Sequence, residues 1–133
     1  MQKKYFSLEE AQAILPDVKK LLSKLLDVQK RMKLRNAFEV RYDDAFFDAR
    51  NLTKKSMEVH KDAYEFFQMM DALMEAGVFV KDPAIGLVDF YSKFDGKEIF
   101  LCYKYPEDMI LYWHGIDEGY AERKGVELLK AKI

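Results

Sequence analysis

The feature that most constrains this chain is the absence of glycine and proline between Asp17 and Ala76. Glycine disfavours helices through its backbone entropy, and proline does so because it lacks an N–H group. From Ile14 to Met32, apolar side chains recur at spacings that alternate between four and three residues, the pattern of a helix that packs on another helix. The sequence therefore predicts an antiparallel helical hairpin over about residues 7–77.

Local signals indicate where these helices begin and end. The segment "SLEE", Ser7–Glu10, has the form of a capping box, in which the serine hydroxyl and the last carboxylate each accept a backbone N–H. Pro16 is expected to kink the helix or to mark the first turn of a second one. The turn between the helices is expected within Arg35–Asp44, and Gly77 is a suitable C-cap for the second helix.

The second helix carries more apolar side chains than one face can hold. One predicted stripe consists of His60, Ala63 or Tyr64, Phe67, Met70 and Met74, with His60 as a core or interface histidine. The adjacent residues Phe66 and Phe67 cannot both face one core, so apolar surface is left over for a partner. We expect a homo-oligomer, most simply a dimer that forms a helical bundle across a two-fold axis.

After Gly77 the pattern changes to strands. Asp95-Gly96 predicts a two-residue hairpin turn, because both central residues need positive φ. This turn pairs Lys93 with Glu98 and, further along, Asp89 with Cys102. With "ILYW" as a third strand, the expected architecture is α+β in one domain. The helical hairpin is followed by a three-stranded antiparallel meander over about residues 78–114 and by a tail, 115–133, that ends in a short helix.

Composition restricts the function classes. The net charge of −1 argues against a dedicated nucleic-acid-binding protein, because such proteins usually carry a basic excess. The single cysteine, Cys102, cannot form an intramolecular disulfide, which is typical of a reducing compartment. The N-terminus lacks a signal-peptide pattern, and no apolar run approaches the roughly 18 residues of a membrane span. We expect a cytoplasmic protein without membrane or nucleic-acid partners.

The segment "YWHGIDEGYAERKG", residues 112–125, concentrates side chains that can do chemistry. In the predicted register, Asp89 and Cys102 are cross-strand neighbours with Cβ atoms about 5 Å apart. The third strand should bring His114 close to Cys102, and Asp117 follows directly. An imidazole with carboxylates is a ligand set for zinc, manganese or iron. This reasoning predicts a divalent-metal site formed by Asp89, His114 and Asp117.

Two other interpretations fit the same residues. In a purely structural one, His114 donates to a backbone carbonyl and Asp117 caps the helix that follows. Arg123 would then pair with Asp89 or Asp117. In a catalytic one, His114 activates the Cys102 thiol, although a cysteine inside a strand is more typically a small buried hydrophobe.

Three segments together resemble a known family. "YFSLEEAQAILP", "VKDPAIGLVDFYSKFDGKEIFLCYKY" and "YWHGIDEGYAER" occur in this order and are similar to the prokaryotic family catalogued as domain of unknown function 2203. The chain departs from the family pattern at Tyr103, where tryptophan is usual, and at Pro106-Glu107, where Gly-Glu is frequent. The resemblance implies a cytoplasmic protein and assigns no activity to it.

These features lead to two functional hypotheses. The first is a non-enzymatic binding or interaction module that self-associates through its helices, with a ligand or partner surface formed by Asp89, His114, Asp117 and Arg123. The second is a divalent-metal-binding protein or a metal-dependent hydrolase, in which His114 and the acids hold an ion that activates water.

Overall fold

The structure, a computed structural model, describes the backbone of residues 3–36 and 45–130. It does not describe the side chains of residues 35, 36, 45–53, 55, 56, 59 and 130. Most of the predicted helix–helix turn, Arg35–Asp44, therefore lies outside the described residues. The elements are, in chain order, α1 (Leu8–Asn36), α2 (Ala45–Glu75), β1 (Val78–Asp82), β2 (Leu87–Phe94), β3 (Lys97–Lys104), β4 (Tyr112–Gly115), η1 (Tyr120–Glu122), β5 (Lys124–Gly125) and α3 (Glu127–Lys130).

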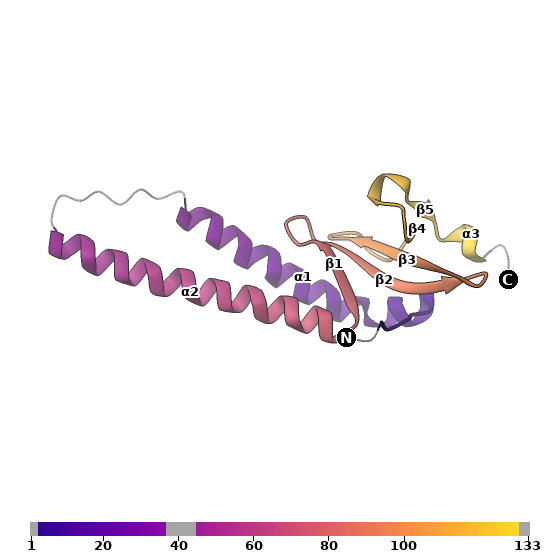
Figure 1. Ribbon diagram of the computed structural model, residues 1–133, viewed down its shortest axis with the longest axis horizontal. Helices are drawn as coiled ribbons and strands as arrows, with labels where there is room; N and C mark the ends of the chain where they lie inside the picture. Colours follow the sequence, from indigo (N-terminus) through magenta and orange to yellow (C-terminus); the bar gives the residue numbers. More distant parts are fainter. Residues whose placement is uncertain (1–2, 37–44, 131–133) are drawn as a thin grey trace.

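The two long helices run side by side, and the sheet lies at one end of them (Figure 1). The sheet is antiparallel throughout, with the strand order β1-β2-β3-β4-β5. The predicted α+β class is confirmed, but the prediction of three strands is wrong because the sheet has five. The segment "VFV" becomes β1 by pairing with β2, and β5 is a two-residue strand on β4, too short to show a periodic pattern.

Helix α1 begins at the predicted capping box. The Ser7 hydroxyl accepts from the Glu10 amide at 3.1 Å, and the Glu10 carboxylate accepts from the Ser7 amide at 3.3 Å. The helix continues through Pro16, so of the two alternatives expected there, the start of a second helix does not occur. Leu15 and Val18 are buried on either side of the exposed proline, and this continuous packing holds both turns in one helix.

One hydrophobic core lies between α1, α2 and the sheet. Its fully buried members from α1 alternate with exposed residues at helical spacing, and they meet side chains from alternate positions of β2 and β3. These core residues are Ala11, Leu15, Val18, Leu22 and Leu25 from α1, Leu73 from α2, Val88 and Phe90 from β2, and Leu101 and Tyr103 from β3. Helix α1 therefore covers one face of the sheet.

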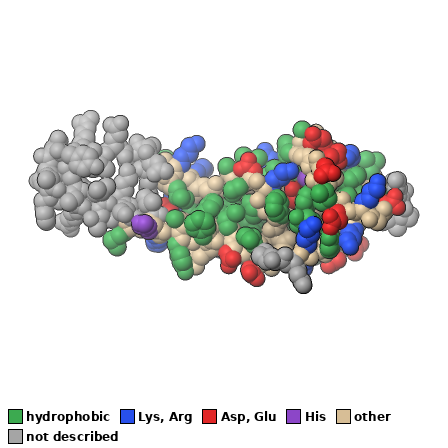
Figure 2. Space-filling view, viewed as in Figure 1, with side chains coloured by type: hydrophobic (Ala, Val, Ile, Leu, Met, Phe, Trp, Pro, Cys, Tyr) green, Lys and Arg blue, Asp and Glu red, His purple; other side chains and the backbone are tan. Residues whose placement is uncertain are grey.

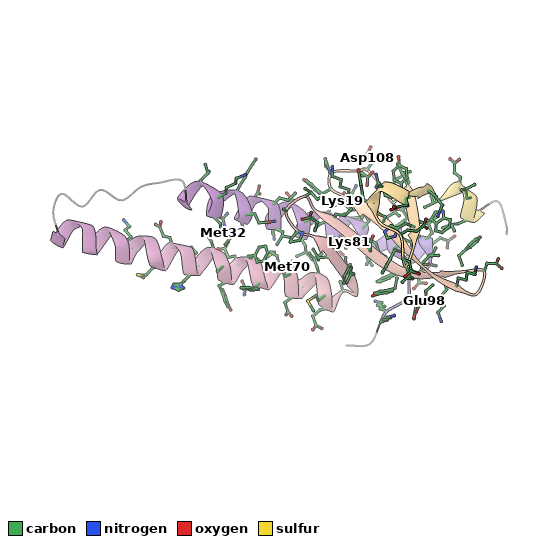
Figure 3. All side chains as sticks on the ribbon, turned by 45° about the horizontal axis from the view of Figure 1, so that its top comes forward. Lys19, Met32, Met70, Lys81, Glu98 and Asp108 are labelled. Atoms are coloured by element: carbon green, nitrogen blue, oxygen red, sulfur yellow. The ribbon has the colours of Figure 1, made fainter. Side chains whose placement is uncertain are left out.

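Side-chain contacts fix the segment that leads into β4. The Gln12 amide on α1 donates to the Ile110 carbonyl at 2.9 Å and accepts from the Ile110 amide at 3.0 Å. Lys19, also on α1, donates to the Asp108 carbonyl (Figure 3). Strand β4 is thus held against β3 from both the sheet and the helix, which determines where His114 lies.

Helix α2 presents a different face to the core than its sequence predicts. The stripe that packs against α1 and the sheet consists of Asp62, Phe66, Met69, Met70 and Leu73. Of the stripe predicted from the sequence, Met70 packs against the core, whereas His60, Tyr64, Phe67 and Met74 are exposed, so His60 is not a core histidine. Paired apolar residues such as Phe66 and Phe67 produce two stripes of equal spacing, and periodicity alone does not select between them.

The hairpin register is confirmed at every predicted pair. Asp95 and Gly96 have φ values of 53° and 74°, as the two-residue turn requires. Lys93 faces Glu98 and Asp89 faces Cys102. Gly77, with φ 87°, ends α2 as predicted and donates to the Met74 carbonyl at 2.9 Å. Within the described part of the chain, no helix combines the length and the apolar character needed to cross a membrane.

Truncating the core should be far more costly than truncating an exposed leucine on the same helix. Leu22 is 0% exposed and Leu34 is 63% exposed, both on α1. We expect Leu22→Ala to lower the free energy of unfolding by about 2–5 kcal/mol in urea denaturation. Leu34→Ala should change it by no more than about 0.5 kcal/mol. Equal effects of the two substitutions would contradict this position of α1.

Candidate functional site

Three side chains with metal-ligating atoms share the sheet face that α1 does not cover. Val88 and Phe90 point into the core, so Asp89 between them points to the opposite face. Cys102 pairs with Asp89 across the β2–β3 ladder and shares its face. His114 pairs with Phe100, two residues from Cys102 on β3, and therefore also lies on this face. Three adjacent strands thus bring one ligand each to the same place.

We call these residues, Asp89, Cys102 and His114, the buried triad. Their side chains are 0%, 1% and 0% exposed, respectively. One ligand atom from each lies within 4.8 Å of the others, and among the described residues they form a group able to hold a metal ion. The closest contact joins His114 Nε2 to Asp89 Oδ1 at 3.0 Å. The metal site predicted from the sequence contained two of these residues, Asp89 and His114, with Asp117 in place of Cys102.

The hydrogen bonds of His114 define its tautomer. Nδ1 lies 2.8 Å from the Gly115 carbonyl oxygen, which only accepts, so Nδ1 carries a proton and donates. If the ring is neutral, Nε2 carries a lone pair directed at Asp89 Oδ1. A carboxylate oxygen is also an acceptor, so these two atoms cannot form a hydrogen bond without a further proton. The 3.0 Å contact therefore contains one shared proton, and the pair is either imidazolium with carboxylate or imidazole with carboxylic acid. In both forms its net charge is zero.

The second oxygen of Asp89, Oδ2, is fully buried and makes no hydrogen bond of ordinary length and angle, although the Cys102 thiol interacts with this carboxylate. An unpaired buried carboxylate oxygen is costly, and most such groups in native proteins have partners. Burial raises the pKa of Asp89 above its usual value, while His114, the charge of Lys81 and a hydrogen bond with Cys102 act in the opposite direction. The triad thus contains an oxygen acceptor without an ordinary hydrogen bond, next to a thiol and an imidazole.

Cys102 has the properties of a protonated, inert thiol. Burial raises its pKa to about 12, with a further contribution from the Asp89 carboxylate, and the nearby Arg123 guanidinium only partly offsets this. A nucleophilic cysteine needs the opposite environment, one that stabilises the thiolate. The geometry therefore gives no support to the catalytic-cysteine interpretation.

Arg123 lies beside the triad but does not bind its carboxylate. Its guanidinium donates to both oxygens of Glu107, at 3.1 and 3.3 Å, so the predicted pairing with Asp89 or Asp117 is wrong. The rings of Tyr112 and Tyr120 flank it, each with its centroid 4.1 Å away. Arg123 therefore holds the C-terminal segment against the turn after β3. The sequence pattern of residues 112–125 did not predict this contact.

Asp117 is exposed on the loop after β4 and is not part of the triad. It does not cap the next helix either, because the N-cap of η1 is Gly119, whose amide donates to Glu122. The carboxylate that organises this loop is Glu118, which accepts from the Gly115 amide at 2.8 Å and from the Lys124 ammonium at 2.6 Å. The placement of Asp117 follows from the turn, which directs its side chain outward.

Aromatic side chains pack beside the triad. The Phe100 ring lies 5.4 Å from the His114 ring and 4.7 Å from that of Tyr91, and Phe79 stacks on it at 6.2 Å. A hollow of about 870 Å³ lies elsewhere, along α1 near Tyr105. A second hollow of about 480 Å³ includes Asp117 and Glu118 in its lining. Neither hollow is lined by a member of the triad.

The state of the Cys102 thiol can be measured directly, because the chain has only one cysteine. With a pKa of about 12, only about one thiol in ten thousand is ionised at pH 8. We expect chelator-stripped native protein to react with Ellman's reagent only on the timescale of unfolding, and denatured protein to release one equivalent at once. Rapid reaction of the native protein would contradict the burial and the protonation of this thiol.

The whole chain was compared with known proteins. Residues 4–126 match the model of a family described as uncharacterized conserved protein, DUF2203. Searches of the curated proteins and of the solved structures gave no match. The matched range includes both long helices, all five strands and every residue of the buried triad. The resemblance in the sequence motifs is therefore confirmed, and the chain belongs to the uncharacterised DUF2203 family.

Proposed function

We propose that this protein binds one transition-metal ion, of the zinc class, through Asp89, Cys102 and His114. The observation that carries the proposal is the fully buried Oδ2 of Asp89, which makes no hydrogen bond of ordinary geometry and belongs to a carboxylate in a group of three ligand residues whose ligand atoms are no more than 4.8 Å apart. Imidazole, thiolate and carboxylate together favour zinc or iron(II) over magnesium or calcium, which prefer oxygen ligands alone.

The hydrogen bond from His114 Nδ1 supports this assignment. Metal-bound histidines usually donate their other ring N–H to a carbonyl or a carboxylate, which fixes the tautomer and the ring orientation. The Gly115 carbonyl accepts that proton at 2.8 Å and leaves Nε2 directed at the carboxylate. A metal ion would take the place of the shared proton between Nε2 and Asp89.

Charge balance also supports a divalent ion. A buried charge is tolerated only when it is compensated nearby. Neutral His114, the Asp89 carboxylate and a Cys102 thiolate carry two negative charges, which a divalent cation cancels. The metal-free triad is neutral because it holds two protons, the shared one and the thiol proton. Binding therefore exchanges two protons for one ion and leaves the buried site neutral in both states.

The required movements are small. Tetrahedral zinc with bonds of about 2.0–2.1 Å to nitrogen and oxygen and about 2.3 Å to sulfur separates its ligand atoms by about 3.3–3.6 Å. The Nε2–Oδ1 distance of 3.0 Å would widen by about 0.3 Å, and the longest separation, at most 4.8 Å, would contract by up to about 1.2 Å. Side-chain rotations on a fixed sheet can supply these shifts. The fourth position would belong to a water molecule or to the second carboxylate oxygen.

The burial of the triad favours binding over hydrolysis. A hydrolytic metal site needs an open position that substrate can reach. The three ligands are at most 1% exposed, and the Phe100 ring packs beside His114. We therefore propose a closed site in which the ion stabilises the sheet, and we propose no reaction.

The test is metal binding by the chelator-stripped full chain, followed by competition with a zinc indicator and by the absorption spectrum with cobalt(II). Wild type should bind one ion per chain, with a thiolate-to-cobalt band. Cys102→Ala, which removes a ligand but keeps a small apolar side chain, should weaken zinc binding by at least about 100-fold and abolish the band. The matched control is Asp117→Asn, because Asp117 is the exposed acid of the metal site predicted from the sequence. This variant should bind zinc like wild type.

Two outcomes would refute the proposal: no stoichiometric binding by folded wild type, or equal binding by wild type and Cys102→Ala. Circular dichroism on each protein confirms that it is folded before the titration. If Asp117→Asn, and not Cys102→Ala, lost the ion, the metal would lie on the exposed loop, and the triad would be a structural hydrogen-bonded cluster.

Metal affinity should depend steeply on pH. Because binding displaces two protons from the triad, the apparent affinity should fall by up to about 100-fold for each pH unit of acidification near neutrality. The affinity falls rather than rises on acidification because protons compete with the ion for the same lone pairs. Competition titrations at two pH values measure the slope. An affinity independent of pH would contradict ligation by the Cys102 thiolate, whose thiol is protonated at neutral pH.

A further inference from the structure

Helix α2 has an exposed apolar stripe on the side away from the core. Its large members are Met57, Tyr64, Phe67 and Met74, which are 69%, 66%, 67% and 44% exposed. Together with the exposed residues His60 and Asp71 they occupy one line with alternating spacings of three and four, the seam of a coiled coil. Figure 2 shows hydrophobic side chains at the surface of the described part of this helical arm.

We propose that two copies of this chain associate through the α2 stripe, antiparallel to each other, about a two-fold axis between Tyr64 and Phe67. The inference concerns a different surface from the metal site and does not depend on it. The pairing of α2 with α2 would complete a four-helix arrangement with the two α1 helices outside.

The sequence of the stripe is self-complementary in this orientation. An axis between Tyr64 and Phe67 places these two rings opposite each other, once on each side of the axis. Met57 of one copy then faces Met74 of the other. His60 faces Asp71, so the two polar positions of the seam meet each other as a hydrogen-bonding pair. At the flank, Lys54 lies near Glu75 of the second copy.

A parallel arrangement lacks this complementarity. It would place each residue opposite its own copy, so Asp71 would face Asp71 within the seam. Two carboxylates in contact at a desolvated interface repel each other, which lowers affinity. Charge complementarity therefore selects the antiparallel dimer among the two coiled-coil geometries.

The area is sufficient for a specific interface. At about 200 Å² for a fully exposed side chain of this size, the four exposed fractions amount to roughly 500 Å² per copy. Two copies would bury on the order of 1,000 Å² from these residues alone, the minimum expected of a biological interface. The stripe also ends at a hollow of about 370 Å³ lined by Met70, Met74 and Phe79, where Met57 of the second copy would lie.

The first experiment is sedimentation equilibrium of the full chain from about 1 μM to about 100 μM. Wild type should be dimeric at the upper end. Tyr64→Glu should raise the dissociation constant at least about 100-fold, because it places a carboxylate against Phe67 in the seam. The matched control is Leu34→Glu, another exposed apolar residue, which lies on α1 and should leave the dissociation constant unchanged. Since both side chains are more than 60% exposed, both variants should keep the melting temperature of the monomer fold.

Orientation is tested by cysteine cross-linking in a Cys102→Ala background. A mixture of Met57→Cys and Met74→Cys chains should form a disulfide-linked heterodimer on mild oxidation, and neither variant alone should cross-link efficiently. A monomeric wild type at about 100 μM, equal effects of Tyr64→Glu and Leu34→Glu, or efficient cross-linking of Met57→Cys with itself would each overturn the proposal.

Discussion

The two-residue turn at Asp95-Gly96 is the constraint on which the rest of the structure depends. Because both of its residues have positive φ, β3 must return along β2 in a single register. A slip of β3 by one residue would turn Leu101 and Tyr103 away from the hydrophobic core and Cys102 into it. The turn therefore determines both which residues α1 covers and which residues form the buried triad.

The two sheet faces are buried in different ways. Helix α1 covers one face with a continuous apolar stripe, as is usual for an α+β protein. On the opposite face, aromatic side chains of the sheet pack on one another, and Arg123 ties the C-terminal segment to Glu107. A buried polar cluster on this face is expensive unless its hydrogen-bonding capacity is used. That cost, evident at Oδ2 of Asp89, is why we propose a bound ion there.

The parts of the structure that were predicted correctly are those set by interactions between residues close together in the sequence. The capping box at Ser7, the turn at Asp95-Gly96 and the C-cap at Gly77 act within a few residues, and all three were predicted correctly. The register then placed Asp89 opposite Cys102 and brought His114 to the same face. Features that depend on tertiary contacts were not predicted correctly or were not predicted at all. The inward face of α2, the partner of Arg123 and the two-residue strand β5 depend on packing that periodicity does not encode.

The most direct test of a metal ion in the buried triad is X-ray absorption at the zinc edge on zinc-loaded full-length protein. We expect one sulfur ligand at about 2.3 Å and nitrogen or oxygen ligands at about 2.0–2.1 Å, one of them showing the multiple scattering of an imidazole ring. Since Cys102 is the only cysteine, a thiolate sulfur at this distance identifies the site. A spectrum with nitrogen and oxygen ligands alone would place the ion elsewhere and contradict ligation by Cys102.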